Sequence, residues 1–384
     1  MSLKEKIYLD YNATTPVDPK VVQAMLPYFT ENFGNASSDH SFGWYADDAV
    51  ETARSQVAKL VNCRPVEITF TSGATEAANL VLFGFCKKNR SKGNHIVSCK
   101  TEHKAVLDTL EALESDGFEV TYLDINGQGN IDLNELEDSI RPSTILVCLM
   151  LANNETGLIH PIEKLTEIAH SKNVPFMSDI TQAVGKIPVD LRHLGIDMAV
   201  FSSHKLYGPK GVGALYLNKR NHISIDKHLF GGNQEKGVRP GTLNVPGIVG
   251  LGESCEIAQQ SLEENHQNFK VLQNHLEQGL STMEGATINC QNQNRLPNTT
   301  NVSFKSVDGT KLLRHLNRLA LSRGSACTAN QVNPSHVLKA MGITDEVALA
   351  SLRISTGRYT TLEDIEKTVT EIKKAVDQLK TSTV

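Results

Sequence analysis

The sequence lacks closely spaced cysteines and histidines of the kind that bind metals. Its seven cysteines are scattered among 384 residues with no C-x-x-C pair, so neither a disulfide framework nor a structural zinc site is indicated. The thirteen histidines include no H-E-x-x-H motif, which argues against a zinc hydrolase. We therefore expect a protein of a reducing compartment, without a metal site.

Long apolar runs and an excess of positive charge are also missing. No apolar stretch reaches about 18 residues, the minimum for a membrane span, and residues 1–6 are too short and charged for a signal peptide. The 38 Lys and Arg residues against 43 Asp and Glu give a net charge of −5, which leaves no electrostatic footprint for nucleic acid. We expect a cytoplasmic protein with no membrane or nucleic-acid partner.

What the sequence does contain is an alternation of apolar runs and helical stretches. The runs predict strands at residues 95–98, 119–123, 145–151, 174–177, 197–201 and 212–217. Such alternation is typical of an α/β fold with a mainly parallel sheet covered by helices. After about residue 250, a polar helical stretch leads into a smaller α+β unit. We expect a large domain of residues 15–255 and a small domain of residues 1–14 and 256–384.

The segment FSSHKLYGPKGVG at residues 201–213 places Lys205 between small hydroxyl side chains and glycines. It follows a predicted strand, so Lys205 stands where a strand gives way to a turn. A partly desolvated lysine in such a place is how a Schiff-base lysine is presented to the aldehyde of pyridoxal phosphate. Taken alone, the same string also fits a solvated lysine in a Gly/Pro loop.

A second candidate, Asp179, closes the apolar run that begins at residue 174. A carboxylate at a strand end suits the ring nitrogen of pyridoxal phosphate, because a nearby anion stabilises the protonated ring. Gln182, three residues later, could donate to the phenolic oxygen of the same cofactor. An Asp that caps the following helix is the structural alternative.

Residues 68–79, ITFTSGATEAAN, read as a strand, a tight turn and a helix start. Exposed N–H groups and the helix dipole at such a start favour a phosphate monoester, with Thr75 supplying a hydroxyl. No G-x-x-x-x-G-K-[ST] motif is present, so a nucleoside triphosphate is disfavoured. A simple capping box from Ser72 explains the same residues structurally.

Cys327 lies in the small-residue stretch RGSACT at residues 323–328. Small neighbours leave a thiol accessible, and an accessible, electropositive place favours the reactive thiolate. Arg323 is close enough in sequence to contribute positive charge. An ordinary buried cysteine is the alternative.

Together these stretches resemble the NifS/IscS-type cysteine desulfurases, which belong to the class V aminotransferases among fold-type I pyridoxal phosphate enzymes. Seven blocks carry the resemblance, in the family's order: YLDYNATTP (8–16), FTSGATE (70–76), TEHKAV (101–106), NNETG (153–157), SSHKLYGPK (202–210), RPGTL (239–243) and GSACT (324–328). The resemblance implies a large domain with a mainly parallel seven-stranded sheet, a smaller α+β domain carrying the Cys327 loop, and a homodimer with shared active sites.

The resemblance also implies three catalytic residues. Lys205 would form the Schiff base with pyridoxal 5′-phosphate, and His103 would stack over the ring and move protons. Cys327 would take sulfur from L-cysteine as a persulfide, leaving L-alanine. Without the family match, His103 would be a solvated residue at a helix start.

The remaining site residues follow by resemblance as well. The expected cofactor contacts are Asp179 at the ring nitrogen, Gln182 and Asn154 at the ring oxygen, Ala74, Thr75, Ser202 and His204 at the phosphate, and Thr242 at the phosphate of the neighbouring subunit. Asn154 and Arg353 would hold the substrate, with the arginine binding its carboxylate. Otherwise Thr242 would lie in a plain turn, and Arg353 would form a surface ion pair on an edge strand.

We therefore expect a cysteine desulfurase that passes sulfur to an acceptor protein, for iron–sulfur cluster or other thio-cofactor biosynthesis. A selenocysteine lyase and a catalytically silent pyridoxal phosphate scaffold are the alternatives. Two departures from the family pattern are noted: Arg323 replaces a small hydroxyl residue, and Met177 and Ser178 replace a His-Val pair. The chain ends soon after its last predicted helix, so an iron–sulfur scaffold is a less certain acceptor than for members with a docking tail.

Overall fold

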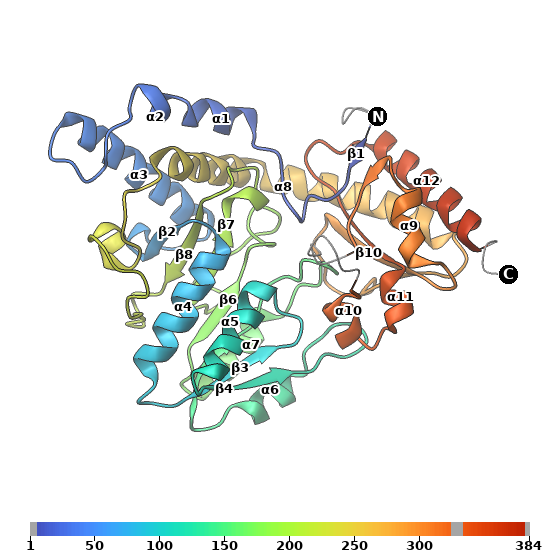
Figure 1. Cartoon of the computed structure of the whole chain (residues 1–384), viewed down its shortest axis with the longest axis horizontal. Coiled ribbons are helices and arrows are strands. Elements are labelled where there is room, and N and C mark those ends of the chain that lie inside the picture. Colours follow the sequence, from blue (N-terminus) through green and yellow to red (C-terminus); the bar gives the residue numbers. More distant parts are fainter. Residues whose placement is uncertain (1–5, 324–332, 381–384) are drawn as a thin grey trace.

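A seven-stranded sheet organises the larger part of the molecule (Figure 1). The computed structural model describes residues 6–323 and 333–380. The strand order is β2-β8-β7-β6-β5-β3-β4. The strands are β2 (Ile68–Thr71), β3 (His95–Cys99), β4 (Glu119–Leu123), β5 (Thr144–Cys148), β6 (Phe176–Asp179), β7 (Met198–Ser202) and β8 (Gly213–Leu217). Each predicted strand overlaps one of them.

The sheet is mainly parallel, as expected, with one reversed strand. The pairs from β4 across to β7 are parallel, whereas β8 runs antiparallel to both β7 and β2. Only a short connection joins β7 to β8, and a parallel crossover would need a dozen or more residues. The reversal therefore follows from the short loop that contains Lys205.

Helices cover both faces of this sheet. Strand β7 shows why: Met198 and Val200 pack into one core, and Ala199 and Phe201 into the other. Successive side chains point to opposite faces, so a strand buried on both sides reads as a continuous apolar run. One face is covered by α4 (Ala74–Asn89) and α5 (Lys104–Ser115), and the other by α3 (Ser41–Leu60), α6 (Leu133–Ser139), α7 (Ile162–Ser171) and the first part of α8 (Val245–Ser281).

A smaller unit surrounds a three-stranded antiparallel sheet of order β12-β10-β9. Its elements are β9 (Ala286–Ile288), β10 (Thr299–Phe304), β11 (Leu319–Ala320), β12 (Ser351–Ser355), α9 (Gly309–His315), α10 (His336–Ala340), α11 (Asp345–Leu349) and α12 (Leu362–Lys380). Strand β1 (Ile7–Tyr8) pairs with β11, so the N-terminal segment joins this unit. The division at residue 255 stays a prediction, because α8 runs through it.

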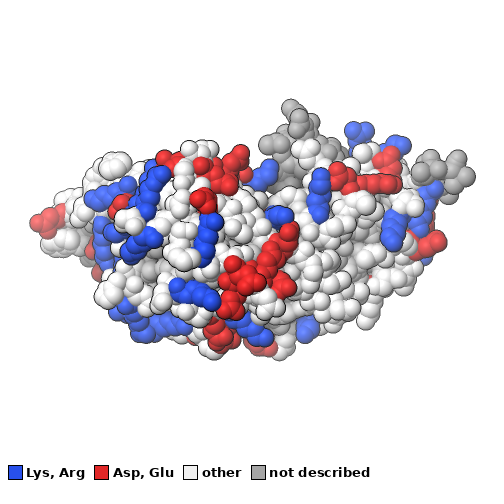
Figure 2. All heavy atoms as spheres, turned by 90° about the horizontal axis from the view of Figure 1, so that it is seen from below, with Lys and Arg blue, Asp and Glu red and all other residues white. Residues whose placement is uncertain are grey.

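Short helices and turns complete the chain. These are α1 (Pro19–Met25), α2 (Pro27–Thr30) and the 3-10 turns at Pro65–Glu67, Ser203–Lys205 and Gln234–Gly237. No helix in the described part of the chain is both long and apolar enough to span a membrane. On the face seen in Figure 2, acidic side chains gather near the middle and basic ones lie on either side.

A buried ion pair ties α3 to the segment before α8. The Arg54 guanidinium donates to both carboxylate oxygens of Glu235, at 2.9 and 2.7 Å. The amide of Phe70 on β2 donates to the same carboxylate at 2.8 Å, and the guanidinium lies 4.7 Å from the centre of the Phe70 ring. The ion pair thus connects α3, the edge strand β2 and the turn that contains Glu235.

We expect Glu235→Ala to lower the free energy of unfolding by about 3 kcal/mol, because it removes the buried carboxylate that pairs with Arg54 and leaves only the exposed Glu51. Denaturation by urea, followed by circular dichroism, measures the change. The control is Glu363→Ala, which breaks an exposed pair with Lys367 on α12 and should cost less than about 1 kcal/mol. Equal effects of the two variants would contradict the prediction.

Candidate active site

A cavity of about 210 Å³ lies at the carboxyl ends of the parallel strands. Lys205, Asp179 and His103 all line it, although they come from different loops. Asp179 ends β6, Lys205 follows β7, and His103 follows β3. The carboxyl ends of such strands form the usual ligand crevice of open α/β sheets. The structure therefore brings these three predicted residues together.

Lys205 is held by the N-terminal segment. Its Nζ donates to the main-chain carbonyls of Asn12 at 2.6 Å and Ala13 at 2.7 Å. Burial, helped by the positive charge of Arg353, lowers the pKa of Lys205 to about 8, although Asp10 and Asp179 oppose this shift. A larger fraction of the amine is therefore neutral and nucleophilic near neutral pH than for a solvated lysine.

Asp179 shapes the turn that follows β6 and also lines the cavity. Its Oδ1 accepts the amide hydrogen of Thr181 at 2.9 Å, which shapes the turn after β6. The same carboxylate lines the cavity beside Lys205. A strand-end carboxylate with one oxygen fixed in this way can present negative charge to a protonated ring nitrogen.

The start of α4 offers a place for a phosphate group. Ala74, Thr75, Ser202 and His204 line this part of the cavity. The amide of Ala74 donates to Ser202 Oγ at 2.7 Å. Gly73, at φ +156°, precedes the helix, and an added Cβ would lie only 3.2 Å from Ser202 Oγ. The helix N-terminus, the two hydroxyls and the Lys205 amine fit an aldehyde that carries a phosphate.

His103 is the N-cap of α5. Its Nδ1 accepts the amide hydrogen of Ala105 at 3.1 Å, so the neutral ring carries its proton on Nε2. The ring surface is open to the cavity, yet the surrounding protein desolvates it and lowers the pKa. Asp179 opposes this shift, while Lys205 and His336 add to it. A neutral His103 can therefore donate a hydrogen bond from Nε2 into the cavity while its N-cap bond is kept.

Arg353 reaches the cavity from β12. Its Nη2 donates to Asp10 Oδ1 at 2.6 Å, and its Nη1 donates to the main-chain carbonyl of Asn154 at 3.1 Å. The side chain is only 4% exposed, so this ion pair is buried rather than on the surface. The buried Nε has no hydrogen-bond partner among the described residues. Such a guanidinium can take up a further anion, such as a carboxylate.

Three predicted residues need separate mention. Asn154 lines the cavity, whereas Thr242 is exposed in a loop outside it. Cys327 lies outside the described residues. Nearby, Arg323 donates to the main-chain carbonyls of Gly309 and Thr310, and it thereby contacts the start of α9.

Sequence reasoning missed two buried residues beside the cavity, Asn12 and Lys186. Asn12 accepts from Lys205, and Lys186 donates to Gln182 and Asn12. Asn12 stands inside the first family block, and Lys186 follows Gln182 by four residues, one helical turn. These two sequence positions were the only indications that Asn12 and Lys186 belong to the site. The contacts of Asn12 with Lys205 and Lys186 join distant parts of the chain, so the sequence alone could not reveal them.

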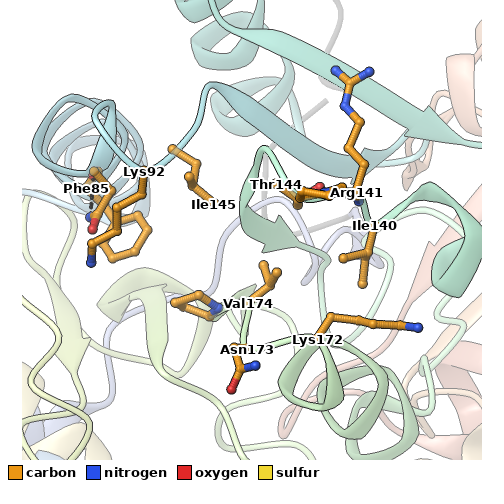
Figure 3. Close-up of a pocket in the computed structure, with 12 residues that line it drawn as sticks. Phe85, Lys92, Ile140, Arg141, Thr144, Ile145, Lys172, Asn173 and Val174 are labelled. Carbon is orange, nitrogen blue, oxygen red and sulfur yellow. Dashed lines mark hydrogen bonds between the residues drawn. The ribbon is translucent and has the colours of Figure 1, made fainter.

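A second cavity, of about 490 Å³, lies beside the amino end of β5 (Figure 3). Its basic side chains include Arg141 and Lys172, which extend away from its middle. Arg141 pairs with Glu119, and Lys172 pairs with Glu137. None of the predicted site residues lines it. No group of metal-binding side chains occurs here or elsewhere in residues 6–323 and 333–380.

Comparison with known proteins agrees with this geometry. Residues 7–368 match the family described as aminotransferase class-V. The cysteine desulfurase IscS of Klebsiella pneumoniae subsp. pneumoniae is 47% identical over 98% of this chain and 94% of its own length. A solved "NIFS-LIKE PROTEIN" is 38% identical, with a TM-score of 0.91 over 97% of this chain and all of that one.

A further solved structure, "SspA in complex with cysteine", is 35% identical, with a TM-score of 0.81 over 92% of this chain and 99% of that one. The chain therefore belongs to the class-V aminotransferase family and, within it, to the cysteine desulfurases. Enzymes of this class use pyridoxal 5′-phosphate. The predicted fold class, family and cofactor are thus confirmed.

We expect the apoprotein to bind pyridoxal phosphate covalently at a rate that rises with pH through about 8 and then levels off, because only the neutral Lys205 amine reacts. At pH 7 about one-tenth of such an amine is neutral, against roughly four in ten thousand for a solvated lysine. Stopped-flow absorbance measures the rate, with a free lysine derivative correcting for titration of the cofactor itself. A corrected rate that keeps rising above pH 10 would contradict the prediction.

Proposed function

We propose that this protein is a cysteine desulfurase that converts L-cysteine to L-alanine and retains the sulfur as a persulfide on Cys327. The main support is one cavity that holds both the amine of Lys205 and the guanidinium of Arg353. An amine can bind an aldehyde, and a guanidinium can bind the carboxylate of an amino acid. The relatives named above are cysteine desulfurases, and one similar structure contains cysteine.

In this proposal the side chains of the cavity divide the work. Pyridoxal phosphate, when bound, supplies an electron sink for charge that develops at the substrate α-carbon. Asp179 supplies the anion for its ring, and Arg353 orients the substrate through its carboxylate. Lys205 takes the proton from the α-carbon, and the neutral His103 donates a hydrogen bond from Nε2.

The sulfur step falls to Cys327. Its thiolate attacks the sulfur of L-cysteine, so that an S–S bond forms and the C–S bond breaks. The electron pair of the broken bond stays on carbon, which takes up a proton and leaves as alanine. The reaction therefore needs no external oxidant or reductant. The persulfide sulfur then passes to an acceptor, for which we propose an iron–sulfur scaffold or another protein of thio-cofactor biosynthesis.

A homodimer with shared sites is part of the proposal. Residues of α2, of α3 and of the turn between them form an exposed aromatic face that consists of Phe29, Phe33, Phe42, Trp44 and Tyr45. Trp44 is 61% exposed, and apolar patches of this kind mark protein contacts. The exposed Thr242 would then serve the phosphate site of the neighbouring subunit. We also propose a cytoplasmic location, which the six described cysteines support because all are free.

The first test compares Cys327→Ala with the wild type for alanine and sulfide release from L-cysteine in the presence of a reductant. We expect the variant to lose at least about a hundredfold in turnover, because no protein thiol remains to accept sulfur. Cys63→Ala, which removes a thiol elsewhere, is the control and should retain activity. Equal turnover by Cys327→Ala would instead favour a selenocysteine lyase, since selenium can leave without a thiol. A wild type that binds no cofactor and turns over no substrate would favour the silent scaffold.

The second test addresses the dimer. We expect the double variant Phe42→Glu and Trp44→Glu to become monomeric, because two charges would be buried at the aromatic face. Light scattering coupled to gel filtration measures the mass. The monomer should also bind pyridoxal phosphate more weakly, since it lacks the neighbour's Thr242. Tyr359→Glu, at an exposed aromatic residue elsewhere, is the control. A double variant with the mass of the wild type would contradict the assignment.

A further inference from the structure

Lys186 is a lysine that the mechanism above does not use, although it lies directly behind the cavity. It belongs to the turn that follows β6, and it is only 6% exposed. It does not line the cavity, but Gln182, one turn earlier, does. A lysine is seldom buried without a carboxylate, and among the described residues none pairs with Lys186. Its environment therefore calls for a specific explanation.

The contacts of Lys186 match a neutral amine. Its Nζ donates to Gln182 Oε1 at 2.6 Å and to Asn12 Oδ1 at 3.2 Å. Burial, together with the charges of Lys205 and Arg353, holds the pKa of Lys186 well below its usual value. A neutral amine has two N–H groups, and both acceptors are present. A charged ammonium would have a third donor to satisfy.

The contact with Lys186 fixes the orientation of the Gln182 amide. The amide oxygen is occupied by Lys186, and Nε2 donates one hydrogen to the main-chain carbonyl of Asn12 at 3.0 Å. The second hydrogen of Nε2 is the polar group that remains for a ligand. If the amide were rotated by half a turn, an oxygen would take this place, and it would repel any acceptor oxygen of the cofactor.

The contact with Asn12 connects Lys186 to the anchor of Lys205. Asn12 Oδ1 accepts from Lys186 and from Asn298 Nδ2, while Asn12 Nδ2 donates to Thr299 Oγ1 at 2.9 Å. These bonds hold the residue whose main-chain carbonyl accepts the Lys205 amine. Lys186 thus supports both polar groups that approach the cofactor from this side.

We propose that Lys186 is a positioning residue of the cofactor site, which holds the Gln182 amide with its oxygen away from the cavity and an N–H free for an acceptor oxygen of pyridoxal phosphate. This inference rests on the cofactor site of the proposed function. It does not depend on cysteine as the substrate or on Cys327. It can therefore be tested on the protein without substrate.

The test measures the affinity of the apoprotein for pyridoxal phosphate and the visible absorption band of the bound cofactor. Lys186→Met removes the amine but keeps an unbranched side chain of similar length. We expect affinity to fall about tenfold, as for the loss of one hydrogen bond to a charged acceptor. We also expect the band to change in wavelength and in the pH at which it titrates. Lys164→Met, at an exposed lysine of α7, is the matched control and should leave both unchanged.

A double-mutant cycle shows whether Lys186 acts through Gln182. In the Gln182→Ala background, Lys186→Met should have little further effect on the band. Full additivity, or a Lys186→Met protein with the affinity and band of the wild type, would overturn the proposal. Lys186→Gln retains a neutral donor and should resemble the wild type, so it provides a test even if the Met variant does not fold. A Lys186→Gln protein with a shifted absorption band would also overturn the proposal. If the wild type and the Lys186 variants show the expected cofactor bands but the wild type has no desulfurase activity, only the proposed function is refuted.

Discussion

The active site depends on the bond between the amine of Lys205 and the main-chain carbonyl of Asn12, at 2.6 Å. Lys205 lies in the turn after β7 of the large sheet, whereas Asn12 lies just after the strand that joins the smaller unit. The amide of Asn12 donates to Ser355 Oγ at 3.0 Å, and its side chain donates to Thr299. One residue of the N-terminal segment therefore holds β7, β10 and β12 in a fixed relation. The cavity is formed where these elements meet.

Charge imposes a second constraint on this place. The charges of Lys205 and Arg353 help to lower the pKa of Lys186, and Arg353 also helps to lower that of Lys205, whereas the nearby carboxylates are Asp10 and Asp179. Cations gathered in a poorly solvated space are costly unless anions accompany them. The lowered pKa values shift both lysines toward their neutral forms, and Arg353 pairs with Asp10. A phosphate and a substrate carboxylate would complete this balance, so the cavity is electrostatically suited to two anions.

Much of the fold and part of the site could be predicted because their signals are local. Asp179 and Lys205 each follow an apolar run, and such runs mark buried strands whose ends meet at one edge of a sheet. Asn12 and Lys186 carried no such signal. Their contacts join residues far apart in the sequence, and neither residue type is normally expected in a core. The pairing of Arg353 with Asp10 escaped prediction for the same reason, since 343 residues separate them.

The structural and the proposed functional role of a residue, which compete when only the sequence is known, are compatible in the folded protein. His103 caps α5 as an ordinary helix-start residue would, and the same bond from Ala105 to Nδ1 places the ring proton of the neutral imidazole on Nε2. Asp179 shapes the turn after β6, and that turn carries Gln182 to the cavity. The local bonds that stabilise the backbone therefore also set the proton position and the direction of each functional group. A variant that removes such a bond changes the chemistry of the site even where the protein still folds. The protonation states of these residues and the absorption spectrum of the bound cofactor therefore report on their roles better than the free energy of unfolding does.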